Sequence, residues 1–215
     1  MITDTETKRG YHHGNLKRAL VLAGVEILEA DGMALLSLRA IAARAGVSHA
    51  APKNHFGCLR GLLTAIAAEG FRRHAAFMRA GLSAASGRKD RLNAAMQGYV
   101  RFAHEHKQLF MLMFSAQHCD FSDPDLNLAA RASYDVLADI SAGLDWDKAN
   151  APGGQRRTEL MLWSFVHGFA QLSNSGLSGP LESGSMAEHL PFDIADIMPD
   201  FSYAPGPGPK TDEAR

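Results

Sequence analysis

The feature that most constrains the fold is a pair of short helical patterns, separated by one glycine, within residues 37–56. In the first pattern, apolar side chains recur at helical spacing: Leu38, Ile41, Ala42 and Ala45. Ser37 is suited to cap this helix, and Gly46 can end it by taking a left-handed backbone conformation. The pattern predicts a helix-turn-helix motif, a unit whose second helix enters the major groove of DNA.

The second helix of this motif is expected over about His49–His55, with Ser48 as its N-cap. Pro52 falls in or just past the opening turn, where a missing N–H costs little. Phe56 would then lie in the core. The side chains expected to point outward are His49, Lys53 and Asn54. An ordinary helical hairpin with a glycine turn would give the same local pattern. Only the surrounding sequence can distinguish the helix-turn-helix motif from such a hairpin.

A basic segment with one aromatic residue, residues 8–18, precedes the motif and lacks the apolar core of a secretion signal. We expect it to reach toward DNA as an arm, the alternative being a terminus that carries only a few charges. A helix is expected from Asn15 to Asp31, because apolar residues recur on one face: Leu16, Ala19, Leu20, Ala23, Ile27 and Leu28. The three helices together predict a compact headpiece.

Charge is distributed unevenly along the chain. Residues 1–80 hold 11 Lys and Arg against 6 Asp and Glu, a net charge of +5, whereas residues 81–215 hold 11 against 17, a net charge of −6. A basic head is attracted to phosphates and an acidic body is repelled by them, which favours DNA binding through one end. A chance fluctuation in charge is the alternative.

These segments resemble the TetR family of bacterial transcriptional repressors. The resemblance runs from residues 11–16 through the helix-turn-helix to His55-Phe56-Gly57 and Leu62-Leu63. The segment Trp163–Gly168 resembles the Trp-His-Gly signature of one branch of the family, and Leu109–Phe114 resembles a recurring segment of its effector domain. The resemblance implies an all-α fold, with a three-helix helix-turn-helix headpiece joined to a helical-bundle domain that binds an effector and dimerises.

The chain departs from the family pattern at two positions. Family members commonly carry a tyrosine and a lysine as phosphate contacts where this chain has Lys53 and Leu59. Lys53 keeps a point charge but loses aromatic packing, and the adjacent Arg60 could replace the missing lysine. The family's operator sequence is therefore not carried over to this chain.

Twelve residues are expected to contact DNA, because they lie in the arm, at the helix caps or on the second helix of the motif. They are Lys8, Arg9, Tyr11, Ser37, Arg39, Ser48, His49, Ala50, Lys53, Asn54, His55 and Arg60. We expect His49, Ala50 and Asn54 to read bases, since asparagine pairs with adenine and alanine touches the thymine methyl group. Phosphate contacts are expected from Lys8, Arg9, Lys53 and His55 and from the backbone N–H groups near Ser37 and Ser48.

Composition sets the outer limits of the fold. The 215 residues are 46% hydrophobic but contain no apolar run of about 20 residues, so no membrane span is expected. Cys58 and Cys119 form no disulfide framework, which fits a reducing cytoplasm. We expect a DNA-binding domain over residues 1–57, a ligand-binding and dimerisation domain over residues 58–198, and a Pro- and Gly-rich tail without regular structure over residues 199–215.

The segment Leu160–Leu172 is apolar nearly all round, with Ser164, His167 and Gln171 as its polar positions. A helix that is apolar on every side has to be covered on every side. We expect a second copy of the chain to cover one face by two-fold symmetry, which predicts a homodimer. A central helix buried within a monomer is the alternative.

An effector pocket is expected among aromatic, methionine and histidine side chains of the second domain. The candidates are Met96, Tyr99, Phe102, Phe110, Met113, Phe114, Tyr134, Trp163 and His167. Such residues also form ordinary cores, and a hydrogen bond within the core would equally satisfy His167. The resemblance implies a repressor that binds a palindromic operator and is released by a small, largely apolar effector.

Two alternatives to a DNA-binding protein are a metal-responsive protein and an enzyme. A metal-responsive protein could use the imidazole and thiolate groups of His104, His106, His118 and Cys119, but His104 and His106 would point to different sides of a helix. The sequence carries no phosphate-binding glycine loop and no nucleophile elbow, so we expect neither an enzyme nor a cofactor.

Overall fold

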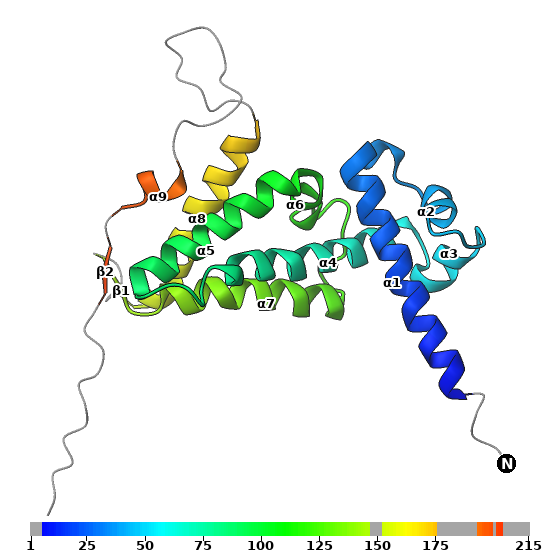
Figure 1. The fold of residues 1–215 in the computed structure, drawn as a ribbon, viewed down its shortest axis with the longest axis horizontal. Helices are drawn as coiled ribbons and strands as arrows, with labels where there is room; N and C mark the ends of the chain where they lie inside the picture. Colours follow the sequence, from blue (N-terminus) through cyan, green and yellow to red (C-terminus); the bar gives the residue numbers. More distant parts are fainter. Residues whose placement is uncertain (1–5, 147–151, 176–192, 200, 204–215) are drawn as a thin grey trace, which may run out of the picture. The chain divides into compact units, whose positions relative to one another are not determined.

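The computed structural model describes the backbone of residues 6–146, 152–175, 193–199 and 201–203, and within these ranges the side chains from Leu16 to Phe201. The expected all-α fold is confirmed (Figure 1). The helices are α1 Glu6–Asp31, the 3-10 helix η1 Met33–Leu35, α2 Leu38–Arg44, α3 Ala51–Phe56, α4 Leu59–Ala80, α5 Arg88–Glu105, α6 Lys107–Met113, α7 Pro124–Ser141, α8 Gly154–Ser175 and α9 Ile194–Ile197. No helix within these ranges is long and apolar enough to cross a membrane.

One short antiparallel pair of strands accompanies the helices. In it β1, Leu144–Asp145, pairs with β2, Ser202–Tyr203, and Leu144 lies opposite Tyr203. The expectation of no regular structure after residue 199 is therefore wrong for these two residues, because the buried Leu144 strand offers them a backbone partner. Residues 204–215 lie outside the described part of the chain.

The chain forms two compact units whose boundaries pass through helices. The first unit is Met1–His74 with Glu105–Ser133, and the second is Ala75–His104 with Tyr134–Arg215. Both α4 and α7 contribute one part to each unit. The boundaries between the two compact units thus fall inside helices. That a DNA-binding domain ends at residue 57 stays a prediction.

The headpiece of the first unit contains α1, α2, α3 and the start of α4. Its centre consists of wholly buried aliphatic side chains: Leu20, Leu28, Ile41, Leu62 and Ile66. Gly24 permits this packing, because a Cβ atom there would lie 2.4 Å from the Cδ1 atom of Ile66. Helix α1 begins at Glu6 and not at Asn15 as expected, since the segment contains no proline and single glycines weaken a helix by only about 1 kcal/mol each.

The remainder of the first unit is an aromatic cluster around α6. The rings of Phe71 and Phe110 both meet Phe114 edge to face, with centroid distances of 5.4 and 5.2 Å. His74 of α4 is buried, and its Nδ1 atom lies 2.7 Å from the Ser133 hydroxyl of α7. This cluster fixes α6 against α4 and the first part of α7.

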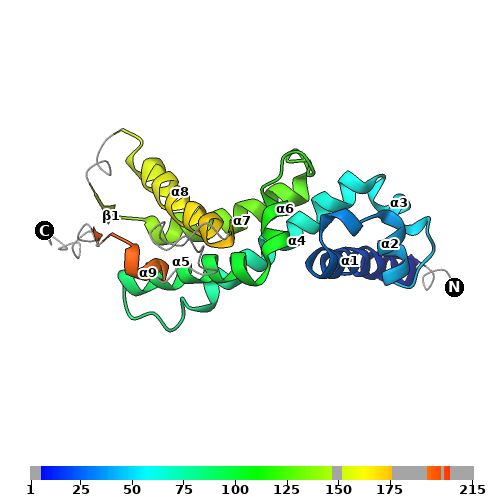
Figure 2. The ribbon, with the colours of Figure 1, turned by 90° about the horizontal axis from the view of Figure 1, so that it is seen from above.

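In the second unit, α4 and α5 approach each other closely at Gly98. A Cβ atom at Gly98 would lie 2.4 Å from the Phe77 carbonyl oxygen, so only glycine fits. Helix α8 is tied to α5 where the Asn174 side-chain amide donates to the Ala103 carbonyl at 2.9 Å. Helix α9 lies beside α5, where Gln97 donates to Asp193 at 3.3 Å (Figure 2). Residues 176–192 lie outside the described part of the chain.

Candidate nucleic-acid interface and ligand site

The first helix of the motif forms as its sequence predicts. Ser37 caps α2, because its Oγ atom accepts a hydrogen bond from the Ala40 N–H at 3.1 Å. Gly46 has a φ angle of 66°, the left-handed conformation expected for it. The Val47 N–H then donates to the Ala42 carbonyl at 3.0 Å, which closes the turn. The turn between α2 and α3 is therefore fixed by local hydrogen bonds.

Helix α3 begins later than expected, at Ala51 instead of His49. Ala50 is its N-cap and makes no side-chain cap, so the prediction that the Ser48 side chain caps this helix is wrong. Ser48 instead offers its backbone carbonyl to the Ala51 N–H at 3.0 Å. Pro52 explains the shift, because proline fits best in the first turn of a helix and so places the start directly before itself.

Most residues predicted to contact DNA are exposed on the headpiece. Those with exposed side chains are Ser37, Arg39, Ser48, His49, Ala50, Lys53, Asn54 and Arg60, whereas His55 is half-buried. Lys8, Arg9 and Tyr11 belong to the first turns of α1, and their side chains are outside the described part of the chain. Lys53 and Asn54 are adjacent on α3.

Phe56 was expected in the core but is only half-buried. The ammonium group of Lys17 lies 5.8 Å from the centre of its ring, at a distance where a cation is attracted to an aromatic face. Phe56 therefore packs α3 against α1 at the edge of the headpiece. The ammonium group of Lys17 lies over the face of this ring.

Arg60, predicted to contact phosphate, also makes a contact within the protein. Its Nη2 atom donates to the Cys119 carbonyl at 3.0 Å. One turn later, the Thr64 hydroxyl accepts from the Asp120 N–H at 2.9 Å. The start of α4 is thus bonded to the loop between α6 and α7. The sequence alone does not indicate these bonds, because the partners are separated by more than fifty residues.

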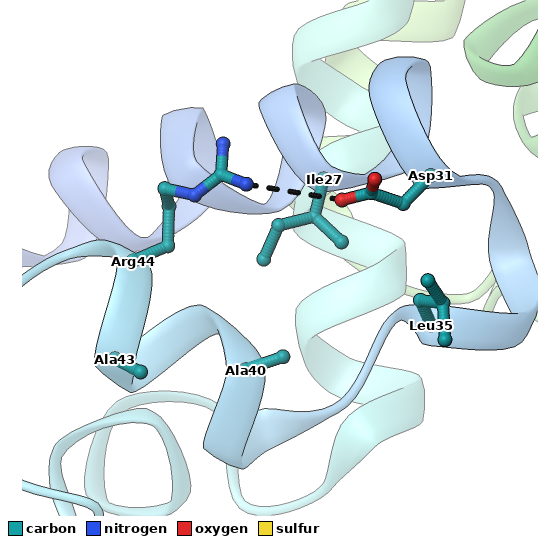
Figure 3. A pocket seen from close by; sticks show the side chains of 6 residues that line it. All are labelled: Ile27, Asp31, Leu35, Ala40, Ala43 and Arg44. Atoms are coloured by element: carbon teal, nitrogen blue, oxygen red, sulfur yellow. Dashed lines mark ion pairs between the residues drawn. The ribbon is translucent and has the colours of Figure 1, made fainter.

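A groove lies on another face of the headpiece, between α1, η1 and α2. It has a volume of about 620 Å³ and is lined by Ile27, Asp31, Leu35, Ala40, Ala43 and Arg44 (Figure 3). Arg44 spans it, with nitrogen–oxygen distances of 3.8 Å to Asp31 and 3.5 Å to Glu26. Exposed ion pairs contribute little to stability, so the main effect of Arg44 here is to orient α2 against α1.

The side chains predicted to line an effector pocket fall into two groups. Phe110, Met113 and Phe114 belong to the first unit, and Met96, Tyr99, Phe102, Tyr134, Trp163 and His167 belong to the second. Met96, Phe102, Phe110 and Met113 are wholly buried among other side chains. The candidates therefore belong to two units, and two of them, Phe110 and Phe114, are part of the aromatic cluster around α6.

Tyr99 and His167 form the polar centre of the second group. The Tyr99 hydroxyl lies 2.8 Å from the His167 Nδ1 atom, and the Gln171 side chain lies 3.4 Å from the Nε2 atom. Burial lowers the pKa of His167 and raises the pKa of Tyr99. Both groups are therefore neutral at pH 7, and they form the core hydrogen bond weighed above as one alternative.

A second polar cluster, centred on Glu159 of α8, was not predicted from the sequence. The Glu159 carboxylate accepts hydrogen bonds from the Tyr134 hydroxyl, from Gln155 at 3.1 Å and from Arg156 at 3.4 Å. Burial raises the pKa of Glu159, but these bonds more than offset it, so the pKa lies below its usual value. The i, i+3 spacing of Arg156 and Glu159 on an expected helix was the available signal.

A protein-family model and several solved structures are similar to this chain. The model of a tetracyclin repressor-like C-terminal domain matches residues 92–190. A solved structure of a protein of unknown function from Rhodococcus sp. RHA1 is 33% identical, with a TM-score of 0.65 over 86% of this chain and 91% of that one. The chain belongs to the TetR family.

Two further solved structures share the fold of this TetR-family protein. One is a possible TetR family transcriptional regulator from Streptomyces coelicolor A3(2), 17% identical, with a TM-score of 0.54 over 79% of this chain and 74% of that one. The other is the TetR-like regulator LfrR from Mycobacterium smegmatis in complex with proflavine, 17% identical, with a TM-score of 0.53 over 84% of this chain and 91% of that one. No curated protein matches the chain.

Family membership gives the headpiece its general role. The TetR-family chain is a DNA-binding transcriptional regulator with a helix-turn-helix motif. The matched C-terminal domain includes Trp163–Gly168, the segment that resembles the signature of one branch.

The alternative of a metal-responsive protein is not supported. Within the described ranges, no group of three or more His, Cys, Asp and Glu side chains could hold a metal ion. The Cys119 thiol is buried and lies 3.5 Å from the Leu112 carbonyl, while His118 lies 2.8 Å from the Ser115 hydroxyl. The two residues thus face separate partners within the TetR-family fold.

Proposed function

We propose that this TetR-family regulator is a repressor that binds a palindromic operator as a homodimer and is released by a small-molecule effector. The observation that carries the proposal is the pair of exposed side chains on α3, Lys53 and Asn54, which follows the capped α2 through the Gly46 turn. A recognition helix fixed in this way can enter the major groove without further ordering. The proposal includes no catalytic step and no cofactor, and places the protein in the cytoplasm.

Direct reading of bases is assigned to the start and the exposed side of α3. Asn54 would pair with an adenine, Ala50 would touch a thymine methyl group, and His49 would contact a neighbouring base. The phosphate contacts are assigned to Lys8, Arg9, Tyr11, Ser37, Arg39, Ser48, Lys53 and His55. The net charge of +5 over residues 1–80 supports a steep salt dependence of binding.

The homodimer is supported by an exposed apolar stripe on α8. Leu160 and Leu172 are each 57% exposed, and Trp163 is 36% exposed. Gly168 lies on the same side of the helix, and a Cβ atom there would meet nothing within 4 Å. These positions fall within the exposed half of α8, with Trp163 and Leu172 at its two edges, so a second α8 can pack across it. The two recognition helices of such a dimer would lie about 34 Å apart on DNA.

The effector is assigned to the second unit, around Tyr99 and His167. These two side chains supply a hydroxyl and an imidazole among apolar neighbours, as small-molecule sites commonly do. LfrR, a protein of the same fold, has been solved with proflavine. An effector can release DNA only if it binds the DNA-free arrangement more tightly than the DNA-bound one.

The test is fluorescence anisotropy of the full chain with DNA that flanks its own gene, over a salt series, with random DNA as competitor. We expect specific binding, a steep salt slope and two chains per site. Loss of binding at low salt with every flanking fragment would contradict the proposal. Equal affinity for flanking and random DNA would also contradict it, because a repressor needs a specific site.

A further inference from the structure

The guanidinium group of Arg156 occupies a defined place on the surface of the second unit. Its carbon lies 5.2 Å from the centre of the Tyr134 ring, a distance at which a cation is attracted to the aromatic face. Its Nη1 atom donates to the Tyr134 hydroxyl at 2.6 Å and to the Glu159 carboxylate at 3.4 Å. A planar cation is thus held by one ring, one hydroxyl and one carboxylate.

The groups that receive this cation are fixed independently of it. The side chain of Glu159 is only 12% exposed, and Gln155 and Tyr134 both donate to its carboxylate. Trp163 meets Tyr134 edge to face, with a centroid distance of 6.1 Å. Because these contacts do not involve Arg156, the carboxylate and the two rings are held in place when the arginine side chain leaves.

Arg156 itself is held weakly compared with the groups around it. Its side chain is 74% exposed, whereas that of Glu159 is 12% exposed. The guanidinium is already largely hydrated, so turning it fully into water costs the arginine itself little. The nearly buried carboxylate would then lose the charge of Arg156, which favours replacement by another cation.

We propose that Glu159, Tyr134 and Trp163 form a binding site for a planar organic cation, which takes the place of the Arg156 guanidinium. The ligand class follows from the present occupant, since an amidinium or guanidinium group matches both the carboxylate and the aromatic face. An aromatic body attached to this group would contact Trp163. The site deepens the proposed function, because it gives the effector a charge as well as an apolar body.

Trp163 belongs both to this site and to the exposed stripe of α8. A cation bound here would therefore lie at the edge of the proposed dimer interface. This position would let the ligand affect the spacing of the two protomers. Binding of the cation can still be measured without DNA, so a failure of the site and a failure of the repressor proposal can be told apart.

The test is isothermal titration calorimetry of the full chain with benzamidine, a planar aromatic cation, and with benzamide, its neutral analogue. The variants are Glu159→Gln, which keeps the shape but removes the charge, and Arg156→Ala, which vacates the site. Arg157→Ala is the matched control, because Arg157 is the next residue on α8 and is also exposed. Thermal melts followed by circular dichroism check that each variant is folded.

We expect benzamidine to bind the wild type and benzamide to bind far more weakly. Glu159→Gln should weaken benzamidine binding by about 10- to 100-fold, the range for losing a hydrogen bond to a charged group. Arg156→Ala should strengthen it by about two- to fivefold, because the competing side chain is gone. Arg157→Ala should bind as the wild type does.

Three results would overturn the proposal. They are equal binding of benzamide and benzamidine, an unchanged affinity in a folded Glu159→Gln variant, and weaker binding in Arg156→Ala. If Glu159→Gln does not fold, Tyr134→Phe replaces it and should weaken benzamidine binding by a smaller factor while keeping the ring. None of these readouts depends on operator DNA, which anisotropy tests separately.

Discussion

We expect two neighbouring residues of α3, Lys53 and Asn54, to separate specific from general DNA binding. Asn54→Ala should cost about 1–3 kcal/mol at each half-site, and only for the base pair that Asn54 reads. Lys53→Ala should weaken binding to all sequences and flatten the slope of log K against log salt by about 0.9 for each lost phosphate contact. Anisotropy with operator, singly substituted operator and random DNA measures both effects.

Both side chains are exposed, so these variants should keep the stability of the wild type. The assignment would be wrong if the two variants lost equal affinity for operator and random DNA. Arg88→Ala, an exposed arginine at the start of α5, serves as a control for a general loss of positive charge.

The two cysteines should differ sharply in reactivity. Cys58 is exposed, whereas Cys119 is buried, and burial raises the pKa of the Cys119 thiol to about 11 against a smaller opposing effect of Arg60. Since the thiolate is the reactive form, Cys119 is almost wholly unreactive at pH 8. Titration with a chromogenic disulfide reagent should count one fast thiol in the native chain and two in denaturant. Two fast thiols in the native chain would contradict the structure.

Residues whose partners are near in sequence were the easiest to predict. The Ser37 cap and the Gly46 turn depend on atoms within a few positions, and both form as expected. Arg60 and Glu159 depend on Cys119 and Tyr134, which lie far along the chain. A single sequence gives no information on such pairings, so the bond of Arg60 to Cys119 and the role of Glu159 were missed.

At the scale of helices, the close approach of α4 and α5 predicts an intolerant glycine. In Gly98→Ala the new methyl group would lie 2.4 Å from the Phe77 carbonyl oxygen and 2.8 Å from the Met78 Cα atom. Backbone atoms cannot turn aside as a side chain can, so the two helices must separate. We expect a loss of about 1–3 kcal/mol in the free energy of unfolding, measured by urea denaturation.

Gly70→Ala is the matched control, since it is also a glycine within a long helix. Its methyl group would lie 2.7 Å from the Cγ and Sδ atoms of Met113, the flexible end of a side chain. Methionine can move to another rotamer, and alanine favours the helix by about 1 kcal/mol over glycine. The stability of Gly70→Ala should stay within about 1 kcal/mol of the wild type. Similar losses in both variants would contradict the distinction between backbone and side-chain contacts.

Helix type was predictable along most of the chain, but helix starts were not. Apolar periodicity identifies α1 and α2 because each must bury one face. Two residues, Ser48 and Pro52, each suggested a different start for α3. The helix begins directly before Pro52, because the proline ring fixes the φ angle, whereas a single side-chain hydrogen bond constrains the backbone less. The start of α1 was misplaced because Gly10 and Gly14 suggest a loop but do not forbid a helix.

At the scale of the whole molecule, the proposals for DNA and for a second copy of the chain rest on different observations. The proposal for DNA uses the net charge of +5 over residues 1–80, and the proposal for a second copy uses the exposed apolar side chains of α8. The charge difference was readable from the sequence because it needs only counting. The sequence could not distinguish residues of an effector pocket from residues of the core, because methionine and aromatic side chains are common in both.

The proposed homodimer gives the prediction that links α8 to DNA binding. A double variant, Leu160→Glu with Leu172→Glu, places carboxylates on the exposed stripe, where two-fold symmetry brings like charges together. The protein should become a monomer by light scattering after gel filtration, while its helix content by circular dichroism stays unchanged. Its affinity for the operator should fall at least about tenfold, or 1.4 kcal/mol, because one headpiece alone makes half of the contacts.

Leu128→Glu provides the control for this experiment. Leu128 is a 70% exposed leucine on α7, outside the α8 stripe, so its replacement should leave both the dimer and operator binding intact. If the double variant stays dimeric and binds the operator as the wild type does, then α8 does not form the interface. If it becomes a monomer with unchanged operator affinity, one headpiece is enough for binding and the palindromic operator is excluded. The proposal is supported only if the double variant loses both the dimer and operator binding. That result would mean that the operator needs the headpieces of two chains.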